Sequence, residues 1–345
     1  MYIAIHVDDG LFFCTDEKFF EICIEEIKKH LTNVTMVRPL KKFVGIHMDH
    51  DREAGFIQCC QSTFIEDLQS TGKAEKLPMC PSYNLRKEPS NPENESLLPV
   101  TGKLRYVCDR TRWDVLVATG EIACGGAQDP SDAHVRTAEK TVNYLRSTND
   151  EYLKLDGVGE LELFAFSDAS YIAEGKSKSR IGGCLFLSLL AGAFYCFSKN
   201  ALLVAQSSTH SELQALDEVL RIVIHCRSVL EFLKCGMLKP TKIYIDNKSA
   251  KELCEVLKSS YKTSSSNMRI NFIRECINNK IIELHFVPTQ SNVADLLTKP
   301  LAYEPFCEHR SKVLYGFSDK HSLDEVSNMV FDFESLSEII VDRLH

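Results

Sequence analysis

No apolar run in this 345-residue chain reaches the roughly 18 residues that a helix needs to cross a bilayer. The start of the chain also lacks the basic head and long apolar centre of a signal peptide. The 14 cysteines contain no pair of Cys-x-x-Cys knuckles at zinc-binding spacing, so we interpret them as free thiols in a reducing compartment. These absences predict an intracellular protein with no membrane partner.

The net charge of −8 is distributed unevenly along the chain. Residues 158–303 contain 17 Lys and Arg against 14 Asp and Glu, so the remaining segments are more acidic than the total. The middle of the chain is therefore more favourable to a phosphate backbone than the overall charge suggests. The length allows two or three domains, and the 44% hydrophobic and 26% charged content is that of an ordinary globular protein.

The first half of the chain predicts a hairpin, a helix, a strand pair and then a helical region behind a proline-rich linker. In order, the expected elements are a hairpin over 1–15, a helix over Asp16–Leu31, strands over Leu40–Met48 and Gly55–Cys60, a helix over Ser62–Ser70, a linker over 78–99, and helices over Thr101–Val107, Arg112–Cys124 and Asp132–Ser147. A polar, glycine-containing stretch near 148–159 closes this part of the chain.

From residue 160 the pattern changes to strands that alternate with helices. The expected elements are strands over Leu161–Asp168, Arg180–Leu187, Gly192–Ser198, Lys242–Asp246 and Ile281–Val287, and helices over Ser211–Cys235, Lys248–Leu257, Asn267–Asn279 and Val293–Leu297. Three antiparallel strands followed by a mixed continuation predict an α/β fold. The tail from Ala302, acidic beyond Ser318, is expected to be a solvated or loosely docked extension, in which apolar residues between Phe331 and Leu344 could line a helix.

Asp168 ends a predicted strand whose apolar residues lie on both faces. Leu163 and Ala165 point to one side of this strand, and Phe164, Phe166 and Asp168 to the other. Apolar residues on both sides indicate a central strand covered on both faces. A carboxylate at the end of such a strand is costly unless a partner neutralises it.

Three further acids have comparable positions in the predicted elements. Glu212 lies in the first turn of the long helix, Asp246 ends a second strand, and Asp295 opens a late helix. Strand ends and helix beginnings can converge at one edge of an α/β sheet, where four carboxylates would need cations between them. Oxygen ligands favour two Mg²⁺ or Mn²⁺ ions, which could act on a phosphodiester. The alternative is that Glu212 and Asp295 interact with helix dipoles and that Asp246-Asn247 caps a helix.

Asp8 and Asp9 allow two interpretations. Paired carboxylates at the tip of a hairpin can hold a divalent metal, but Asp-Gly is also a good hairpin turn. The residues alone favour the turn.

The order of these motifs resembles the Pol polyproteins of copia-type retrotransposons. In the second half, Phe-Ser-Asp-Ala-Ser, Ser-Ser-Thr-x-x-Glu, Ile-Asp-Asn-Lys-Ser-Ala and Val-Ala-Asp-Leu-Leu-Thr-Lys-Pro-Leu are similar to the ribonuclease H domain of that family. In the first half, His6–Asp9 resembles the reverse transcriptase Asp-Asp box, and the segments Phe43–Ile46, Gln61–Ile65, Gly102–Tyr106 and Thr111–Asp114 resemble its palm and connecting regions. The likeness covers about residues 1–317 and reverses the interpretation of Asp8 and Asp9, which become vestigial polymerase metal ligands.

The resemblance implies a ribonuclease H-like mixed sheet with flanking helices, preceded by a truncated reverse transcriptase region. It implies a palm segment at 1–85, a helical thumb or connection region at 86–157, the ribonuclease H-like domain at 158–303 and an acidic extension at 304–345. The expected activity is two-metal cleavage of the RNA strand of an RNA/DNA hybrid, with Asp168, Glu212, Asp246 and Asp295 as ligands. The expected partners are this hybrid and the remainder of a Pol polyprotein, in cytoplasmic virus-like particles or the nucleus.

Polar residues near the four acids are candidates for nucleic-acid contacts. Their hydroxyl, amide or basic side chains could reach RNA 2′-hydroxyls or phosphates. These candidates are Lys199, Asn200, Ser208, Asn247, Arg269 and Arg274.

The sequence departs from the family pattern at four places, one of which is His6, where the family's Asp-Asp box has Tyr. It starts immediately before the Asp-Asp box, without the earlier palm carboxylate and the fingers, so we expect no polymerisation by this chain alone. Ser264-Ser265-Ser266 replaces a Lys-His-Ile stretch, and Asn271 stands where the family has a later His. The missing imidazoles predict slow turnover. They also leave two alternatives open, a non-catalytic remnant that at most binds nucleic acid, and a metal-free protein-interaction scaffold.

Overall fold

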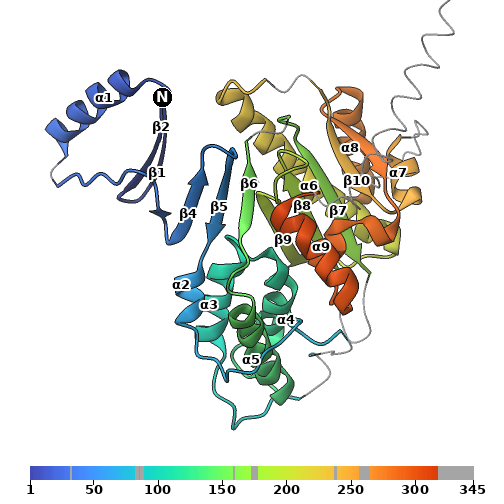
Figure 1. Ribbon diagram of the computed structural model, residues 1–345. Coiled ribbons are helices and arrows are strands. Elements are labelled where there is room, and N and C mark those ends of the chain that lie inside the picture. The colour runs from blue at the N-terminus through green and yellow to red at the C-terminus, as the bar shows by residue number, and fades with distance from the viewer. Residues whose placement is uncertain are drawn as a thin grey trace, which may run out of the picture.

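The computed structural model describes residues 1–31, 33–81, 85, 89–157, 160–171, 178–236, 239–255 and 265–317. The strands of this part form a two-stranded, a four-stranded and a five-stranded sheet. The small sheet lies at one end of the molecule, and the four-stranded sheet lies between it and the five-stranded sheet (Figure 1). One group of helices, α2 to α5, lies below the two larger sheets in this view.

The predicted N-terminal hairpin and helix are confirmed. Strands β1 (Tyr2–His6) and β2 (Asp9–Phe13) pair antiparallel, and helix α1 (Glu17–His30) follows. Asp16 caps this helix, since its Oδ1 accepts a hydrogen bond of 3.1 Å from the Phe19 amide.

The four-stranded sheet differs from the prediction in two ways. It contains β3 (Lys42–Phe43), β4 (Ile46–Asp51), β5 (Phe56–Cys60) and β6 (Leu153–Asp156) in that order. The strand expected over Leu40–Met48 is split, because Val44 and Gly45 turn the chain with φ of +48° and +77°. The polar stretch near 148–159, for which the sequence analysis names no strand, contains β6, whose four residues pair with β5.

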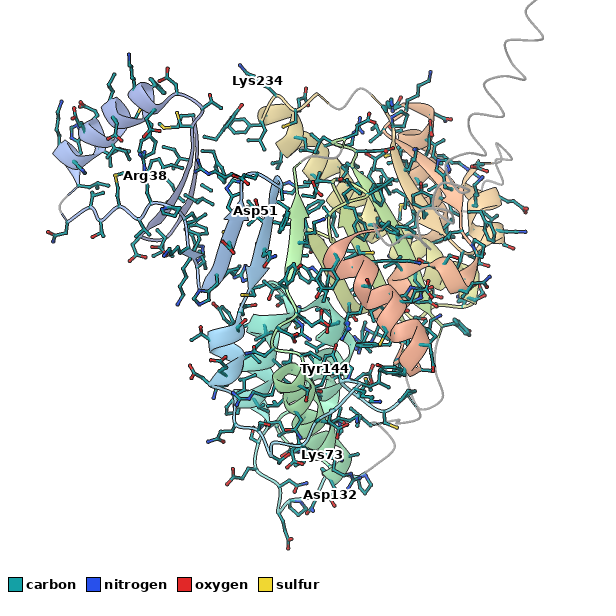
Figure 2. The ribbon with its side chains drawn as sticks, viewed as in Figure 1. Arg38, Asp51, Lys73, Asp132, Tyr144 and Lys234 are labelled. Carbon is teal, nitrogen blue, oxygen red and sulfur yellow. The ribbon has the colours of Figure 1, made fainter. Side chains whose placement is uncertain are left out.

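The helical region consists of α2 (Ser62–Glu66), α3 (Leu98–Cys108), the 3₁₀ helix η2 (Trp113–Val115), α4 (Leu116–Gly126) and α5 (Asp132–Ser147). These elements follow the predicted order. Inside the region, the Arg112 guanidinium pairs with Asp114 at 2.8 Å. Tyr144, which is labelled in Figure 2, donates a hydrogen bond of 2.5 Å to the same carboxylate. The buried charges are thus paired and hydrogen-bonded, as burial requires.

The five-stranded sheet has the order β11-β10-β7-β8-β9. Strands β7 (Phe164–Ser170), β8 (Arg180–Phe186) and β9 (Tyr195–Asn200) are antiparallel, and β10 (Thr241–Ile245) and β11 (Ile282–Phe286) run parallel to β7. The accompanying helices are α6 (Ser208–Phe232), α7 (Lys248–Glu255), α8 (Ser265–Asn278), η3 (Thr289–Ser291), η4 (Val293–Leu297) and α9 (Tyr303–Tyr315). This is the ribonuclease H-like mixed sheet with flanking helices that the sequence predicts.

Both faces of this sheet are buried, as the alternation around Asp168 predicts. Leu163 and Ala165 pack with residues of α6 and α8 in one core. Phe164 and Phe166 pack in a second core that includes residues of α3, α4, α5 and α9. The second core therefore crosses the boundary proposed between residues 157 and 158, and the domain limits remain predictions.

The start of the predicted extension is not loosely docked. Phe306, Val313, Leu314 and Phe317 are buried in the second core, so α9 and the residue that follows its C-cap belong to the folded body. The helix proposed between Phe331 and Leu344 lies outside the described residues. In the part of the chain that is described, no helix combines the length and the apolarity that a membrane span requires.

Candidate metal centre

Two of the predicted acids lie at the ends of neighbouring strands. Asp168 is near the end of β7, and Asp246 follows the last residue of β10. The strands are parallel, with Tyr244 opposite Phe166, so continuing this register brings Asp246 beside Asp168. Asp168 is buried and Asp246 half-buried. The sheet thus places two carboxylates side by side at one edge.

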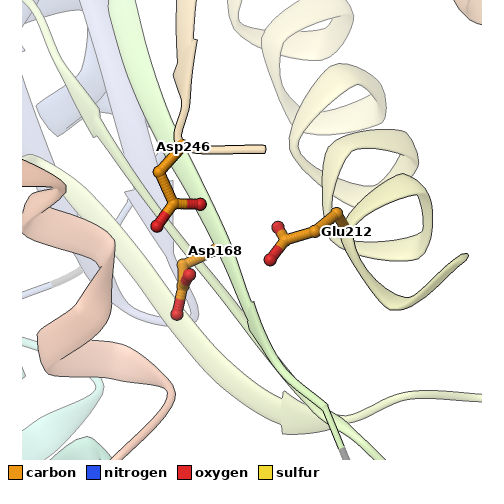
Figure 3. A group of neighbouring side chains, drawn as sticks. All are labelled: Asp168, Glu212 and Asp246. Carbon is orange, nitrogen blue, oxygen red and sulfur yellow. The ribbon is translucent and has the colours of Figure 1, made fainter. Parts of the chain in front are cut away.

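Glu212 reaches the same edge from α6. This helix begins at Ser208, with Ser207 as its cap, so Glu212 lies in the second turn and not in the first. One carboxylate oxygen from each of Asp168, Glu212 and Asp246 lies within 4.8 Å of the others (Figure 3). This is the arrangement that the sequence predicts for three of its four acids.

The helix-cap alternative applies to Asn247. Its Oδ1 accepts a hydrogen bond of 2.9 Å from the Ala250 amide at the start of α7. The neighbouring Asp246 carboxylate instead belongs to the acidic cluster. Capping and clustering are therefore divided between two adjacent residues.

Asp295 lies near this cluster without being one of its three close members. It is buried in η4, and its Oδ1 forms an ion pair of 2.8 Å with Lys299. Burial and the nearby Asp168 raise the pKa of Asp295 to about 7. The predicted quartet is thus a close group of three with a fourth acid beside it.

Burial and mutual repulsion perturb the other carboxyl groups. Burial, with the charges of Asp168 and Asp246, raises the pKa of Glu212 well above its ordinary value. Burial and Asp168 also raise the pKa of Asp246. Each shift has the sign expected for like charges held together away from water. The carboxyl groups of this cluster therefore repel one another when they are ionised.

Two residues of the site carry no predicted role in the sequence analysis. Thr298 donates a hydrogen bond from its Oγ1 to Asp168 Oδ2. Burial lowers the pKa of the Lys299 ammonium, but Asp168 and Asp295 outweigh it and leave this pKa raised. Both residues belong to the motif around Asp295. The four-residue spacing from Asp295 was an available signal for Lys299, but no local spacing connects Thr298 with Asp168.

The donor set fits a hard divalent cation. All three close ligands are carboxylates, and oxygen ligands are those that Mg²⁺ and Mn²⁺ prefer. Glu212 Oε2 is buried without a hydrogen-bond partner, and burying an ionisable oxygen in this way is costly. Coordination of a cation by this oxygen would offset the cost. A cation bound here would offset the repulsion among the carboxylates and would give Glu212 Oε2 a partner.

Three of the predicted nucleic-acid contacts lie at the end of β9 and at the start of α6. Lys199 is exposed and pairs with Glu218, Asn200 donates a hydrogen bond of 3.0 Å to Cys124 Sγ, and Ser208 is exposed. Asn200 is thus engaged with α4. The roles of all three in binding remain predictions.

The other candidates lie on or beside α7 and α8. Arg269 pairs with Asp217 at 3.3 Å, and Arg274 donates a hydrogen bond of 2.6 Å to the Leu253 carbonyl. Asn271, which stands in place of the family's histidine, is exposed on α8. Ser264 lies outside the described residues.

Asp8 and Asp9 are exposed at the tip of the β1–β2 hairpin. Val7 and Asp8 form the two-residue turn, so Asp9 already belongs to β2. Within the described ranges, the only group of three or more acidic, His or Cys side chains close enough to hold an ion is the one around Asp168. The hairpin as described thus has the geometry of a turn.

Comparison with known proteins relates the chain to retrotransposon proteins. It is 24% identical over 320 residues to the retrovirus-related Pol polyprotein from transposon RE1 of Arabidopsis thaliana, which covers 91% of this chain. It is also 24% identical over 317 residues to the corresponding protein from transposon TNT 1-94 of Nicotiana tabacum. The chain spans only 21% and 24% of the length of these two relatives. No protein-family model matches it.

Solved structures with some likeness include a foamy viral protease-reverse transcriptase in complex with double-stranded DNA, with 12% identity and a TM-score of 0.46. That match covers 83% of this chain and 46% of the viral one. Another is LC11-RNase H1 in complex with an RNA/DNA hybrid, with 13% identity and a TM-score of 0.30 over 40% of this chain and 94% of the other. These scores are low, so the assignment of the fold here depends on the strand order of the five-stranded sheet.

Proposed function

Because the chain belongs to the Pol polyproteins of copia-type retrotransposons, we propose that it cleaves the RNA strand of RNA/DNA hybrids as a ribonuclease H. The observation that carries this proposal is the convergence of Asp168, Glu212 and Asp246 within 4.8 Å at one edge of the mixed sheet. The proposed active site lies within residues 158–303, and α9 packs against the same domain.

The four acidic residues act as metal ligands in the proposed reaction. Asp168 and Asp246, side by side on adjacent strands, would hold two Mg²⁺ or Mn²⁺ ions, with Glu212 and Asp295 completing the ligand set. When bound, such a pair supplies an activated water and stabilises the leaving 3′ oxygen. Lys299, paired with Asp295, keeps one positive charge beside the carboxylates.

The hybrid would lie across the exposed start of α6 and the surfaces of α7 and α8. Ser208, Asn200 and Asn247 would contact sugars, and Lys199, Arg269 and Arg274 would contact phosphates. Recognition of 2′-hydroxyls would distinguish the RNA strand. Asn200, Asn247 and the two arginines would have to exchange their present contacts for the nucleic acid.

We place the protein inside the cell, in cytoplasmic virus-like particles or in the nucleus, acting with the remainder of a Pol polyprotein. We assign no polymerase activity to Asp8 and Asp9, because among the described residues these exposed acids have no accompanying group able to complete a metal site.

The test is incubation of the full chain with a labelled RNA/DNA hybrid and Mg²⁺ or Mn²⁺. We expect cleavage of the RNA strand, loss of cleavage in Asp246→Asn and Glu212→Gln, and no cleavage of double-stranded DNA. Glu231→Gln is the matched control, since it changes an exposed carboxylate at the far end of the same helix. Cleavage that persists unchanged in Asp246→Asn would reject the mechanism.

The alternative is a remnant that binds nucleic acid without cutting it, and the exposed Asn271 in place of a histidine favours it. Hybrid binding without metal-dependent cleavage would select this alternative. A metal-free scaffold would show no rise in melting temperature on addition of metal.

A further inference from the structure

Hydrogen bonds connect helix η4 to strand β7 at both ends of the helix. At its start, Asn292 Nδ2 donates a hydrogen bond of 3.0 Å to the Ser167 carbonyl. The Asn292 Oδ1 accepts a hydrogen bond of 3.2 Å from the Ala294 amide, so one side chain both caps η4 and attaches it. At its end, Thr298 Oγ1 donates to Asp168 Oδ2. Asn292, Thr298 and Asp168 are all buried.

The attachment depends on a close approach to strand β8. Gly182 lies directly opposite Asp168 in the β7–β8 register. A Cβ atom at position 182 would lie 2.7 Å from Leu297 Cβ and 2.9 Å from Thr298 Cγ2. Such distances do not occur in real structures, so any larger residue at 182 would displace the end of η4 and withdraw the hydroxyl from Asp168.

The hydroxyl of Thr298 has a single proton to donate. Its other neighbour, the Asp295 carbonyl, lies at 3.3 Å, which is long for a hydrogen bond donated by a hydroxyl group. A hydrogen bond to an ionised carboxylate is stronger than one to a neutral carbonyl, so the proton is directed at Asp168. That bond fixes the rotation of the carboxylate that shares the acidic cluster with Glu212 and Asp246.

We propose that Thr298 is a positioning residue for the metal centre, acting through Asp168. The proposal rests on the proposed function. Partners of this kind orient ligand groups, and their removal typically lowers metal affinity or activity by about 10–100-fold. Thr298→Val keeps the shape of the side chain and removes its donor, whereas Thr298→Ser keeps the donor. A purely structural role in filling space would be preserved better by Val than by Ser.

The experiment measures Mn²⁺ binding to the full chain by electron paramagnetic resonance, without nucleic acid, alongside hybrid cleavage. We expect Thr298→Val to bind Mn²⁺ at least tenfold more weakly and to lose kcat with an unchanged KM. Thr298→Ser should stay within about threefold of the wild type. Equal losses in Val and Ser, or no loss in Val, would overturn the proposal.

A second variant, Gly182→Ala, tests the same contact from the opposite strand with the Thr298 hydroxyl intact. We expect weakened Mn²⁺ binding in a chain that still melts cooperatively in EDTA, and unchanged binding in such a chain would contradict the proposal even if Thr298→Val failed to fold. If the wild type binds Mn²⁺ but cuts no hybrid, the proposed function fails while the Mn²⁺ titrations still decide the role of Thr298. A wild type that binds no Mn²⁺ rejects both.

Discussion

Replacing Glu212 by Gln should stabilise the metal-free protein. The Glu212 carboxylate lies within 4.8 Å of two other carboxylates, and at that separation each pair of charges repels by about 3.5 kcal/mol for an effective dielectric constant of about 20. Protonation relieves most of this repulsion, because burial raises the pKa of Glu212. We therefore expect a gain of about 1–3 kcal/mol in the free energy of unfolding, well below the full Coulomb sum.

The gain should depend on pH in a defined direction. The folded-state pKa of Glu212 is raised above the ordinary value of 4.5, so the folded protein retains a proton that the unfolded chain loses. The wild type is therefore destabilised progressively as the pH rises from 4.5 through the folded-state pKa. Glu212→Gln removes this loss, and its advantage should be small at pH 5 and larger at pH 8.

Thermal melting in EDTA and in Mg²⁺ measures both effects. In EDTA at pH 8 the variant should melt about 1–4 °C above the wild type, since an unfolding entropy of about 2.1 cal/mol/K per residue makes 1 kcal/mol correspond to about 1.4 °C in a chain of 345 residues. In Mg²⁺ the order should approach reversal, because a ligand at 100 times its Kd stabilises the wild type by about 2.7 kcal/mol. Glu231→Gln should change neither curve. A variant that melts below the wild type in EDTA, or an equal Mg²⁺ effect on both proteins, would refute the electrostatic reasoning.

Three further predictions concern the packing around the site. Burial lowers the pKa of His309 to about 4, so stability should fall as the pH drops from 6.5 to 4, by up to about 3 kcal/mol, and His309→Phe should abolish that part of the pH dependence in urea denaturation. Glu121→Ala leaves the buried Arg180 without its 2.6 Å ion-pair partner and should lower the free energy of unfolding by about 3–5 kcal/mol. The double variant Glu121→Ala/Arg180→Met should recover most of this loss in urea denaturation. A fragment of residues 158–317 lacks the helices that cover the aromatic face of β7 and β8, so it should bind a hydrophobic dye and self-associate; a monomer that melts like the full chain would contradict the shared core.

Local patterns were sufficient for the elements around Asp168. The alternation from Leu163 to Asp168 predicts a strand buried on both faces, and this is confirmed. The helices predicted over Asp16–Leu31 and Asp132–Ser147 are confirmed within two residues at each end, because polar caps and apolar periodicity mark them locally. The start of α6 was placed three residues late, since Ser207 and not a later residue provides the cap.

Local patterns failed where a neighbour distant in the sequence decides the conformation. Residues 153–156 form strand β6 because they make backbone hydrogen bonds with β5. Helix α9 packs on the sheet because the aromatic face would otherwise be exposed to water. The alternation Leu153-Lys154-Leu155-Asp156 covers only four residues, and the helical spacing of Phe306, Val313 and Leu314 does not indicate what the helix packs against. For this reason the sequence analysis names no strand at 153–156, and its expectation of a loosely docked extension is wrong for residues 302–317.

By itself, the sequence determined which acids the site contains, on which strands and helices they lie, and that hard cations suit them, because side-chain chemistry and periodicity are local properties. Only the tertiary structure decided that Asp168, Glu212 and Asp246 form the close group and that Asp295 stands beside it, paired with Lys299. It also placed the Thr298 hydroxyl against Asp168, 130 residues earlier in the chain. Such contacts depend on how closely η4 packs over Gly182, and close packing is a property of the assembled fold.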